Sequence, residues 1–281
     1  MTAVPEITLN DGTTIPQLGF GVWQVPADEA QAVVAEALKV GYRHIDTAAV
    51  YENEEGVGRA IAESGIPREE LYITTKLWVS DFKAGQTKEA LRTSLQKLGL
   101  DYVDLYLIHW PSPEDEKYLE AWKALEELQD EGLTRSIGVS NFLPHHLDRV
   151  AEVGTKTPAI NQIELHPALQ QRQVQEANES RGIKTQAWSP LAQGAVFGDE
   201  PIVKAAEAHG VSPAQVIIRW HLQQGRILFP KSVTPERIAS NFDVFGFELS
   251  DAEVDAITAL ERDGRTGMHP DSFNGSSQSR V

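Results

Sequence analysis

Residues Gly41–Gly58 read GYRHIDTAAVYENEEGVG, and this stretch decides the fold. A short apolar run ends within it at Asp46, and Tyr51 follows five residues later. Two similar runs end further along the chain, LYITT before Lys76 and VDLYLI before His109. An acid, a phenol, an amine and an imidazole therefore stand at the ends of three successive strand-like segments. In a parallel barrel these strand ends share one face, which is where barrel enzymes hold their active-site residues.

Strand-like and helical patterns alternate along the rest of the chain. Strands are predicted over residues 18–21, 43–47, 71–75, 103–108, 136–139, 160–163, 184–188 and 227–229. Between them apolar residues recur at helical spacing, most clearly at Ala30, Val33, Val34, Ala37 and Leu38, and at Leu91, Ser94, Leu95 and Leu98. Eight such units predict an α/β fold whose parallel sheet closes into a (β/α)8 or TIM barrel. Because 281 residues are close to the size of one barrel, we expect a single domain over residues 1–281.

The two ends of the chain carry separate signals. Residues 7–9 and 13–15 flank the turn sequence NDG, which predicts an N-terminal β-hairpin that plugs one end of the barrel. Near the other end, Ser250 and Glu253 have the spacing of a capping box and begin a last helix. The Gly- and Ser-rich tail from Gly264 onward lacks periodicity, and we expect it to form a C-terminal loop over the barrel mouth.

Composition narrows the classes of function. A net charge of −16 argues against nucleic acid or an anionic membrane as a partner, because both attract clustered Lys and Arg. No apolar run approaches the roughly 20 residues of a membrane helix. The N-terminal sequence MTAVPEITLN lacks the basic and apolar regions of a secretory signal. The absence of Cys excludes disulfides and suits a reducing cytoplasm, so we expect a cytoplasmic protein, and a monomer.

The stretch Gly41–Gly58, together with ITTKLW around Lys76 and LIHWP around His109, resembles the sequences of the aldo-keto reductase family. Further similar segments are IGVSNF at residues 137–142, NQIELHP at 161–167, WSPL at 188–191 and PKSV at 230–233. The similarity covers nearly the whole chain in order, and it is greatest to the prokaryotic 2,5-diketo-D-gluconate reductases and their relatives. The resemblance implies an NADPH-dependent carbonyl reductase with a catalytic tetrad of Asp46, Tyr51, Lys76 and His109.

The chemistry of carbonyl reduction asks for these residue types. A hydride must reach the carbon and a proton the oxygen, so a general acid must stand beside the oxygen, and Tyr51 fills this role. A Lys76 ammonium about 4 Å from the phenol, at an effective dielectric near 20, favours phenolate by roughly 4 kcal/mol and lowers its pKa by up to about three units. Asp46 would hold Lys76 charged, and His109 would orient the carbonyl oxygen. Taken singly, each residue is more often an ordinary surface or core residue. Together, in matching motifs, the four favour the functional interpretation.

The glycine fingerprint of dinucleotide-binding folds is absent, because neither GFG at residues 19–21 nor GVG at 56–58 continues to a third glycine before a helix. The resemblance instead implies an extended NADPH across the barrel top. Ser140, Asn141 and Gln162 would bind the carboxamide, and Trp188 would stack on the nicotinamide unless it is ordinary core. The resemblance extends the cofactor site to Ser189, Leu191, Phe229, Ser232 and Val233.

A phosphate cradle is predicted after the eighth strand. Lys231 and Arg237 supply two cations, and Thr234 resembles an N-cap with Pro235 in the first helical position. A helix N-terminus, an Arg and a Lys together suit the 2′-phosphate that distinguishes NADPH from NADH. By family analogy the adenine would lie near Ser240 and Asn241. The alternative is a pair of ordinary solvated charges.

The substrate pocket is the least determined part. By family analogy Trp23, Val50, Trp78 and Trp110 would form an apolar wall around the tetrad, although barrel packing would also explain them. Small aldehydes, ketones and dicarbonyls are the expected substrates, and sugar-derived keto acids are a further class for which Arg265 of the tail could bind the carboxylate. The remaining histidines show no metal-ligand spacing, so we expect no metal.

Two functions of other classes stay open from the sequence. One is a regulatory or redox-sensing module that binds NADPH with little turnover, and the intact tetrad counts against it. The other is a sugar-binding or structural barrel without a cofactor, which would leave Lys231 and Arg237 unexplained.

Overall fold

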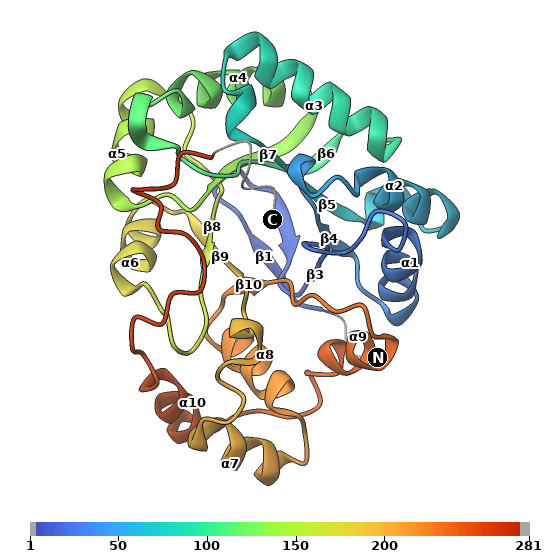
Figure 1. The fold of residues 1–281 in the computed structure, drawn as a ribbon, viewed down its shortest axis with the longest axis vertical. Helices are drawn as coiled ribbons and strands as arrows, with labels where there is room; N and C mark the ends of the chain where they lie inside the picture. The colour runs from blue at the N-terminus through green and yellow to red at the C-terminus, as the bar shows by residue number, and fades with distance from the viewer. Residues whose placement is uncertain (1–3, 276–281) are drawn as a thin grey trace.

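The computed structural model describes residues 4–275. Eight parallel strands pair in sequence order, and helices surround them (Figure 1). The strands are β3 Phe20–Gly21, β4 His44–Asp46, β5 Tyr72–Leu77, β6 Val103–Ile108, β7 Thr134–Ser140, β8 Ile160–Glu164, β9 Lys184–Trp188 and β10 Ile227–Leu228. The sheet closes on itself because Leu18 bridges Leu228 in parallel and the Gly19 N–H donates to the Leu228 carbonyl at 2.8 Å. The predicted (β/α)8 barrel is confirmed.

The helices bury their apolar stripes, most of them around the barrel, whereas α7 packs against α8 and α10. They are α1 Ala30–Val40, α2 Glu54–Glu63, α3 Ala84–Leu98, α4 Tyr118–Asp130, α5 Pro144–Val153, α6 Arg172–Ser180, α7 Glu200–His209, α8 Pro213–Gln223, α9 Pro235–Phe242 and α10 Asp251–Thr258. Both helical faces that the sequence marks, in α1 and in α3, are buried. The capping box that begins α10 is present, with the Ser250 N–H 2.8 Å from Glu253 Oε2.

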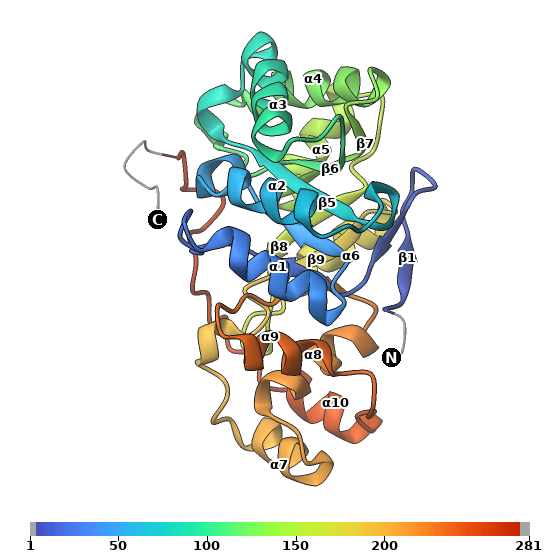
Figure 2. The same ribbon diagram turned by 90° about the vertical axis from the view of Figure 1, so that its right-hand side faces the viewer.

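A hairpin of β1 (Glu6–Thr8) and β2 (Thr14–Pro16) covers one end of the barrel, as predicted. Leu9 and Ile15 of this hairpin are buried in one cluster with Leu105, Leu107 and Ile160 of the strands. Figure 2 shows the hairpin and the C-terminal tail on opposite sides of the barrel. The tail side, at the carboxyl ends of the strands, is therefore the open mouth.

Two local expectations need correction. β5 continues through Lys76 to Leu77, because Lys76 pairs with Leu107 of β6, so Lys76 lies within the strand and not after it. Thr234 stands at the N-cap of α9 but its side chain caps nothing; the Ser232 hydroxyl instead accepts the Thr234 N–H at 3.1 Å.

The tail crosses the barrel mouth, as predicted. Backbone N–H groups of Thr266 and Gly267 donate to the buried Glu164 carboxylate at 2.6 and 3.0 Å. Further on, the Phe273 ring is buried against Trp110, with centroids 4.6 Å apart. The end of the predicted tail, residues 276–281, lies outside the described residues.

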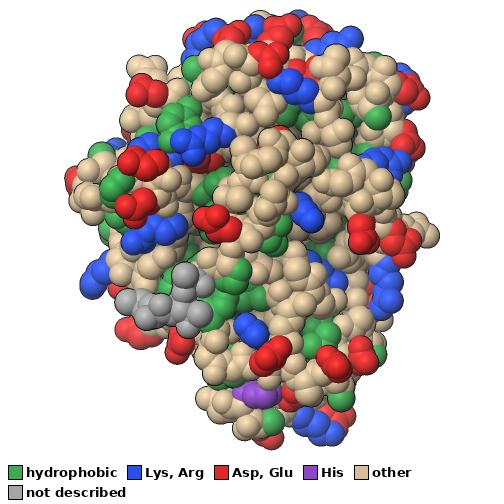
Figure 3. All heavy atoms as spheres, turned by 180° about the vertical axis from the view of Figure 1, so that it is seen from behind, with side chains coloured by type: hydrophobic (Ala, Val, Ile, Leu, Met, Phe, Trp, Pro, Cys, Tyr) green, Lys and Arg blue, Asp and Glu red, His purple; other side chains and the backbone are tan. Residues whose placement is uncertain are grey.

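The surface at the hairpin end carries acidic and basic side chains that are interspersed (Figure 3). None of the helices in residues 4–275 has the length and apolar character needed to cross a membrane.

Candidate active site

Lys76 forms the centre of a buried polar cluster at the barrel mouth. It extends from β5 toward Asp46 on the neighbouring strand β4, and its Nζ lies 2.5 Å from Asp46 Oδ1. The same Nζ donates to the Thr47 carbonyl at 2.8 Å and lies 3.4 Å from the Tyr51 hydroxyl oxygen. Lys76 is fully buried. Three of the four predicted catalytic residues are therefore in direct contact.

The segment after β4 aims Tyr51 at Lys76. Tyr51 ends a short 3₁₀ helix, Ala49–Tyr51, and Asn53 follows it. The buried Asn53 amide accepts from the Thr47 hydroxyl at 2.9 Å and donates to the Val22 carbonyl at 2.9 Å. It thereby ties this turn to the loop after β3. No role could be predicted for Asn53 from the sequence, although it lies within the stretch Gly41–Gly58.

His109, which follows β6, completes the cluster. Its ring meets those of Tyr51 and Trp78 edge-on, with centroids 5.6 and 5.3 Å apart. Burial, and then the charge of Lys76, hold the pKa of His109 well below its ordinary value, so the imidazole is neutral. Nδ1 is buried without a partner in the described chain. A buried donor without a partner is rarer than such an acceptor, so we place the proton on Nε2.

The Asp46–Lys76 pair is shielded from solvent. Burial raises the pKa of Asp46 and lowers that of Lys76, while the contact between them opposes both shifts. A second buried carboxylate, Glu54 on α2, also favours the charged form of Lys76. Glu54 accepts from the hydroxyl of Thr75, the residue before Lys76, at 2.6 Å. The role of Glu54 could not be predicted from the sequence either, because nothing in its spacing shows that it is buried.

The expected lowering of the Tyr51 pKa is wrong for this structure. Burial, and then the negative charge of Asp46, raise the pKa of Tyr51 well above its ordinary value. Burial of the phenol is the larger cause, and Asp46 also offsets the charge of Lys76, so the phenol does not face an isolated cation. Tyr51 is therefore fully protonated near neutral pH.

Side chains from β7, β8 and β9 form a second polar group beside the tetrad. Gln162 Nε2 donates to Asp46 Oδ2 at 2.9 Å. Asn141 donates to the His109 carbonyl at 3.0 Å, and its Oδ1 accepts from the Trp188 indole N–H at 2.8 Å. Ser140 donates to the Gln162 carbonyl at 2.8 Å and accepts from Asn141 at 3.2 Å. The predicted carboxamide residues thus contact one another and the tetrad.

Comparison with known proteins identifies the family of the chain. Residues 16–262 match the model of the aldo/keto reductase family. The chain belongs to the aldo/keto reductase family. It is 56% identical over 270 residues to an aldo-keto reductase of Mycolicibacterium smegmatis, and 54% identical over 271 residues to the methylglyoxal reductase DkgA of Escherichia coli K12. Each alignment covers 96% of this chain and 98% of the relative. Membership makes the chain an oxidoreductase.

Solved structures agree with the fold. An NADPH complex of a Gox0644 mutant superimposes with a TM-score of 0.93 and 48% identity, over 97% of this chain and 99% of the other. An aldo/keto reductase of Brucella melitensis gives a TM-score of 0.91 and 52% identity, over 93% and 99%.

Most of the other predicted cofactor residues of this reductase lie after β10, whereas Ser189 and Leu191 follow β9. Phe229 is buried near Lys76, whose Nζ lies 6.0 Å from its ring centroid. Lys231 and Arg237 are exposed, and among the described residues neither forms a salt bridge. The remaining residues differ in burial: Ser232 and Asn241 are buried, Ser189, Leu191 and Ser240 are partly buried, and Val233 is exposed. The two cations are thus free to meet an anion.

Aromatic side chains line the mouth. Trp23, Val50 and Trp78 are partly buried and Trp110 is buried, and the Trp78 ring lies beside that of His109. Phe273 of the tail packs against Trp78 and Trp110. This contact could not be predicted, because the tail has no periodicity in its sequence.

Arg265 is not available as a substrate anchor. Its guanidinium donates to Gln171 at 3.1 Å and lies 3.7 Å from Glu164. Burial alone would raise the pKa of Glu164, but hydrogen bonds from His166 and from Thr266 in the tail lower it. Arg265 and Thr266 therefore serve to fasten the tail to this carboxylate.

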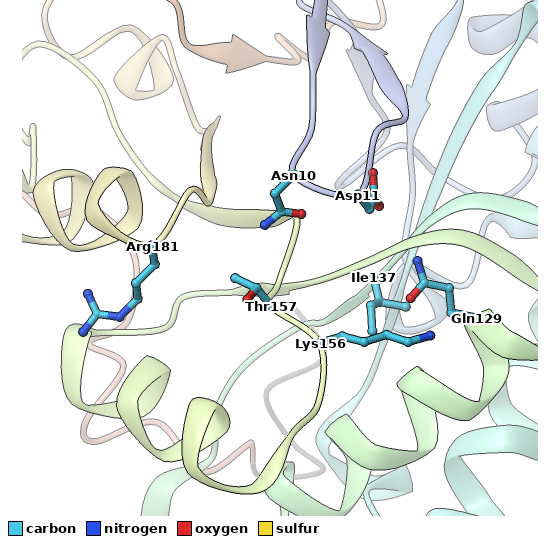
Figure 4. A pocket seen from close by; sticks show the side chains of 7 residues that line it. All are labelled: Asn10, Asp11, Gln129, Ile137, Lys156, Thr157 and Arg181. Carbon is cyan, nitrogen blue, oxygen red and sulfur yellow. The ribbon is translucent and has the colours of Figure 1, made fainter.

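Two other polar clusters carry no chemistry. A hollow of about 300 Å³ at the hairpin end is lined by Asn10, Asp11, Lys156 and Arg181 (Figure 4). Both of its cations are already paired, Lys156 with Asp130 at 2.5 Å and Arg181 with a carboxylate of α5. The hollow lies at the hairpin end, because Asn10 and Asp11 belong to the turn between β1 and β2.

His145, His146 and Asp271 bring ligand atoms within 4.8 Å of one another. The His146 Nδ1 accepts the Leu143 N–H at 3.1 Å, so its proton sits on Nε2, the atom that faces Asp271 at 3.5 Å. A metal ligand needs the reverse, a free Nε2 and a protonated Nδ1. The three residues therefore fit a polar contact between α5 and the tail, in which His145 Nε2 lies 3.0 Å from Asp271 Oδ1.

Proposed function

We propose that this aldo/keto reductase converts small aldehydes, ketones or dicarbonyls to alcohols, with Tyr51 as the proton donor. The observation that carries the proposal is the chain Tyr51–Lys76–Asp46, in which a protonated phenol lies 3.4 Å from a buried ammonium at the barrel mouth. The substrate class also draws on the relative from Escherichia coli that is named methylglyoxal reductase.

The residues present fit NADPH, the cofactor of this family. Gln162 Oε1 accepts no hydrogen bond from the described residues, and Asn141 Oδ1 accepts one, so both keep capacity for the amide N–H groups of a carboxamide. Trp188 is only partly buried, which leaves part of its ring for the nicotinamide. Lys231 and Arg237, exposed beside the start of α9, suit the 2′-phosphate. Ser240 and Asn241 would lie along the adenine.

Each residue of the tetrad has one task. NADPH, when bound, supplies the hydride to the carbonyl carbon. The Tyr51 hydroxyl gives its proton to the carbonyl oxygen as charge develops there, and the O–H bond that forms completes the alcohol. The phenolate left on Tyr51 is stabilised by Lys76, whose ammonium is 3.4 Å away. Asp46 keeps Lys76 charged and in place.

His109 orients the substrate. Its imidazole is neutral, and with the proton on Nε2 it donates a hydrogen bond to the carbonyl oxygen without competing for the Tyr51 proton. Trp23, Val50, Trp78 and Trp110 enclose the substrate in an apolar wall, which strengthens both polar contacts by excluding water.

A carbonyl panel tests the proposal. Purified protein is given methylglyoxal, small aldehydes, ketones and a sugar-derived keto acid, with NADPH and in parallel with NADH, and oxidation of the cofactor is followed by its absorbance. We expect carbonyl-dependent oxidation that prefers NADPH and is lost in Tyr51→Phe. Tight NADPH binding without any carbonyl-dependent oxidation would instead support the regulatory module, and binding of neither cofactor would support the structural barrel.

We further propose that the protein acts as a cytoplasmic monomer. The absence of Cys suits a reducing compartment, which supports the location. Light scattering tests whether the protein is a monomer, and cell fractionation tests whether it is cytoplasmic.

A further inference from the structure

Gln186 lies beside the predicted carboxamide site without being part of it. It stands on β9 directly opposite Gln162 on β8, and the two residues are 0% and 2% exposed. Gln162 Nε2 donates to Gln186 Oε1 at 3.0 Å. No part of the proposed reaction so far uses Gln186.

The carboxylate of Asp46 dictates how both amides are oriented. A carboxylate only accepts hydrogen bonds, so Gln162 must turn its nitrogen toward Asp46, at 2.9 Å. The second N–H of this nitrogen then points at Gln186, which must present its oxygen. Both N–H groups of Gln162 are therefore used inside the barrel, and its carbonyl oxygen is the only part of the amide left for a ligand.

Packing alone does not account for Gln186. When its oxygen faces Gln162, its own Nε2 is buried with no hydrogen-bond partner in residues 4–275. A buried donor without a partner destabilises a fold, whereas an apolar side chain of the same shape would not. The feature that the Gln186 side chain does provide is an acceptor for Gln162.

We propose that Gln186 is a positioning residue that locks the Gln162 amide with its carbonyl oxygen toward the barrel mouth, where it accepts a hydrogen bond from the carboxamide NH₂ of the cofactor. Two hydrogen bonds hold the Gln162 amide in this orientation: the two N–H groups of its nitrogen donate to Asp46 and to Gln186. With only Asp46 left, the amide can turn about that single hydrogen bond. This inference rests on the proposed function, since it assumes a nicotinamide cofactor in the site.

The experiment compares two cofactors that differ in the group concerned. NADP⁺ carries the carboxamide, whereas its 3-acetylpyridine analogue has a methyl group in place of the NH₂. Calorimetric titration measures the affinity of each without turnover, in the wild type, Gln186→Met and Gln186→Glu. Met removes the acceptor at similar length, and Glu keeps an oxygen there. Thr74→Val is the matched control, because it removes a buried polar group of β5 whose contact, at 3.4 Å, is to His44 and not to Gln162.

We expect the wild type to prefer NADP⁺, and Gln186→Met to lower this preference by about three- to tenfold, the range of one neutral hydrogen bond. Gln186→Glu and Thr74→Val should keep the preference, even where either variant changes both affinities together. Gln186→Leu takes the place of Gln186→Met if the latter fails to fold in a thermal melt.

Equal weakening of both cofactors in Gln186→Met would overturn the proposal, because it would reduce Gln186 to barrel packing. An unchanged preference in that variant would do the same. A wild type that binds both cofactors equally well would also refute it, while carbonyl reduction in the panel described above would leave the proposed function intact.

Discussion

Replacing Lys76 by Met tests the central ion pair most directly. The side chain is fully buried, and its Nζ contacts Asp46, the Thr47 carbonyl and Tyr51. Met fills a similar volume, so packing changes little. Asp46, whose side chain is 2% exposed, is then left without its counter-ion and keeps only the hydrogen bond from Gln162.

The magnitude follows from this burial. Removing one partner of a buried ion pair destabilises a protein by about 3–5 kcal/mol, because the other charge stays buried and uncompensated. For a domain of this size that corresponds to a midpoint of thermal unfolding lowered by roughly 10 °C. An exposed pair such as Lys204 with Glu200 on α7 would change stability by only about 0–1 kcal/mol.

The loss of stability caused by Lys76→Met grows as pH rises. Burial already raises the pKa of Asp46, and without Lys76 nothing of equal strength opposes it. Between the two pKa values, Asp46 keeps its proton in the folded variant and has lost it in the unfolded chain. The free energy of unfolding of the variant therefore falls as pH rises from the pKa of the unfolded chain to the raised pKa of the folded variant. Between these two pKa values, the difference in free energy of unfolding between the variant and the wild type grows by up to about 1.4 kcal/mol per pH unit.

Unfolding measured at pH values from about 5 to about 8 checks this, since that range lies above the ordinary pKa of Asp. Asp46→Asn combined with Lys76→Met is the matched control: it removes the stranded carboxylate and should recover stability and lose the added pH dependence. The reasoning is refuted if the deficit of Lys76→Met is the same at every pH, or if the double variant is no more stable than the single one.

Three further predictions concern activity. Tyr51→Phe should lower kcat by about 10²–10⁴-fold through loss of the general acid while NADPH affinity stays near wild type, and near-normal turnover would rule out Tyr51 as the donor. Arg237→Ala should weaken NADPH binding by about one to two decades, the range of one charge-assisted hydrogen bond, and leave NADH almost unaffected; equal losses for both cofactors in a fluorescence titration would assign Arg237 to the fold or the adenine. Phe273→Ala should shift kcat/KM by about tenfold from methylglyoxal toward bulky aldehydes, because its ring packs on Trp110 at the mouth, and an unchanged ratio would exclude it from the pocket.

The barrel and most of the site could be predicted because periodicity reports them. The limits of β6 and β9 match the predicted ranges; β6 is an almost continuous apolar run that is buried along its whole length and ends before His109. Once the strands are parallel and ordered, Asp46 and Lys76 must lie on adjacent strands. Their contact then follows from topology and not from any feature of either residue.

The tail could not be predicted in the same detail. Gly264 to Asn274 has no apolar period, and its course is set by distant partners: the Glu164 carboxylate receives Thr266 and Gly267, and two indoles receive Phe273. Gly267 is required at its position, because a Cβ there would lie 2.4 Å from the Trp188 ring. A sequence shows a glycine at that place but not the ring behind it.

Electrostatics sets a second limit on prediction from the sequence, and the pKa of Tyr51 is the example. A count of charges from the sequence places Lys76 beside Tyr51 and predicts a lowered pKa. Burial of the phenol opposes that shift, and the negative charge of Asp46, which lies 2.5 Å from the ammonium, opposes it further. The result suits reduction better than the expected one would. A phenol that keeps its proton at neutral pH is always ready as the acid, and Lys76 then stabilises the phenolate only when the carbonyl oxygen has taken the proton.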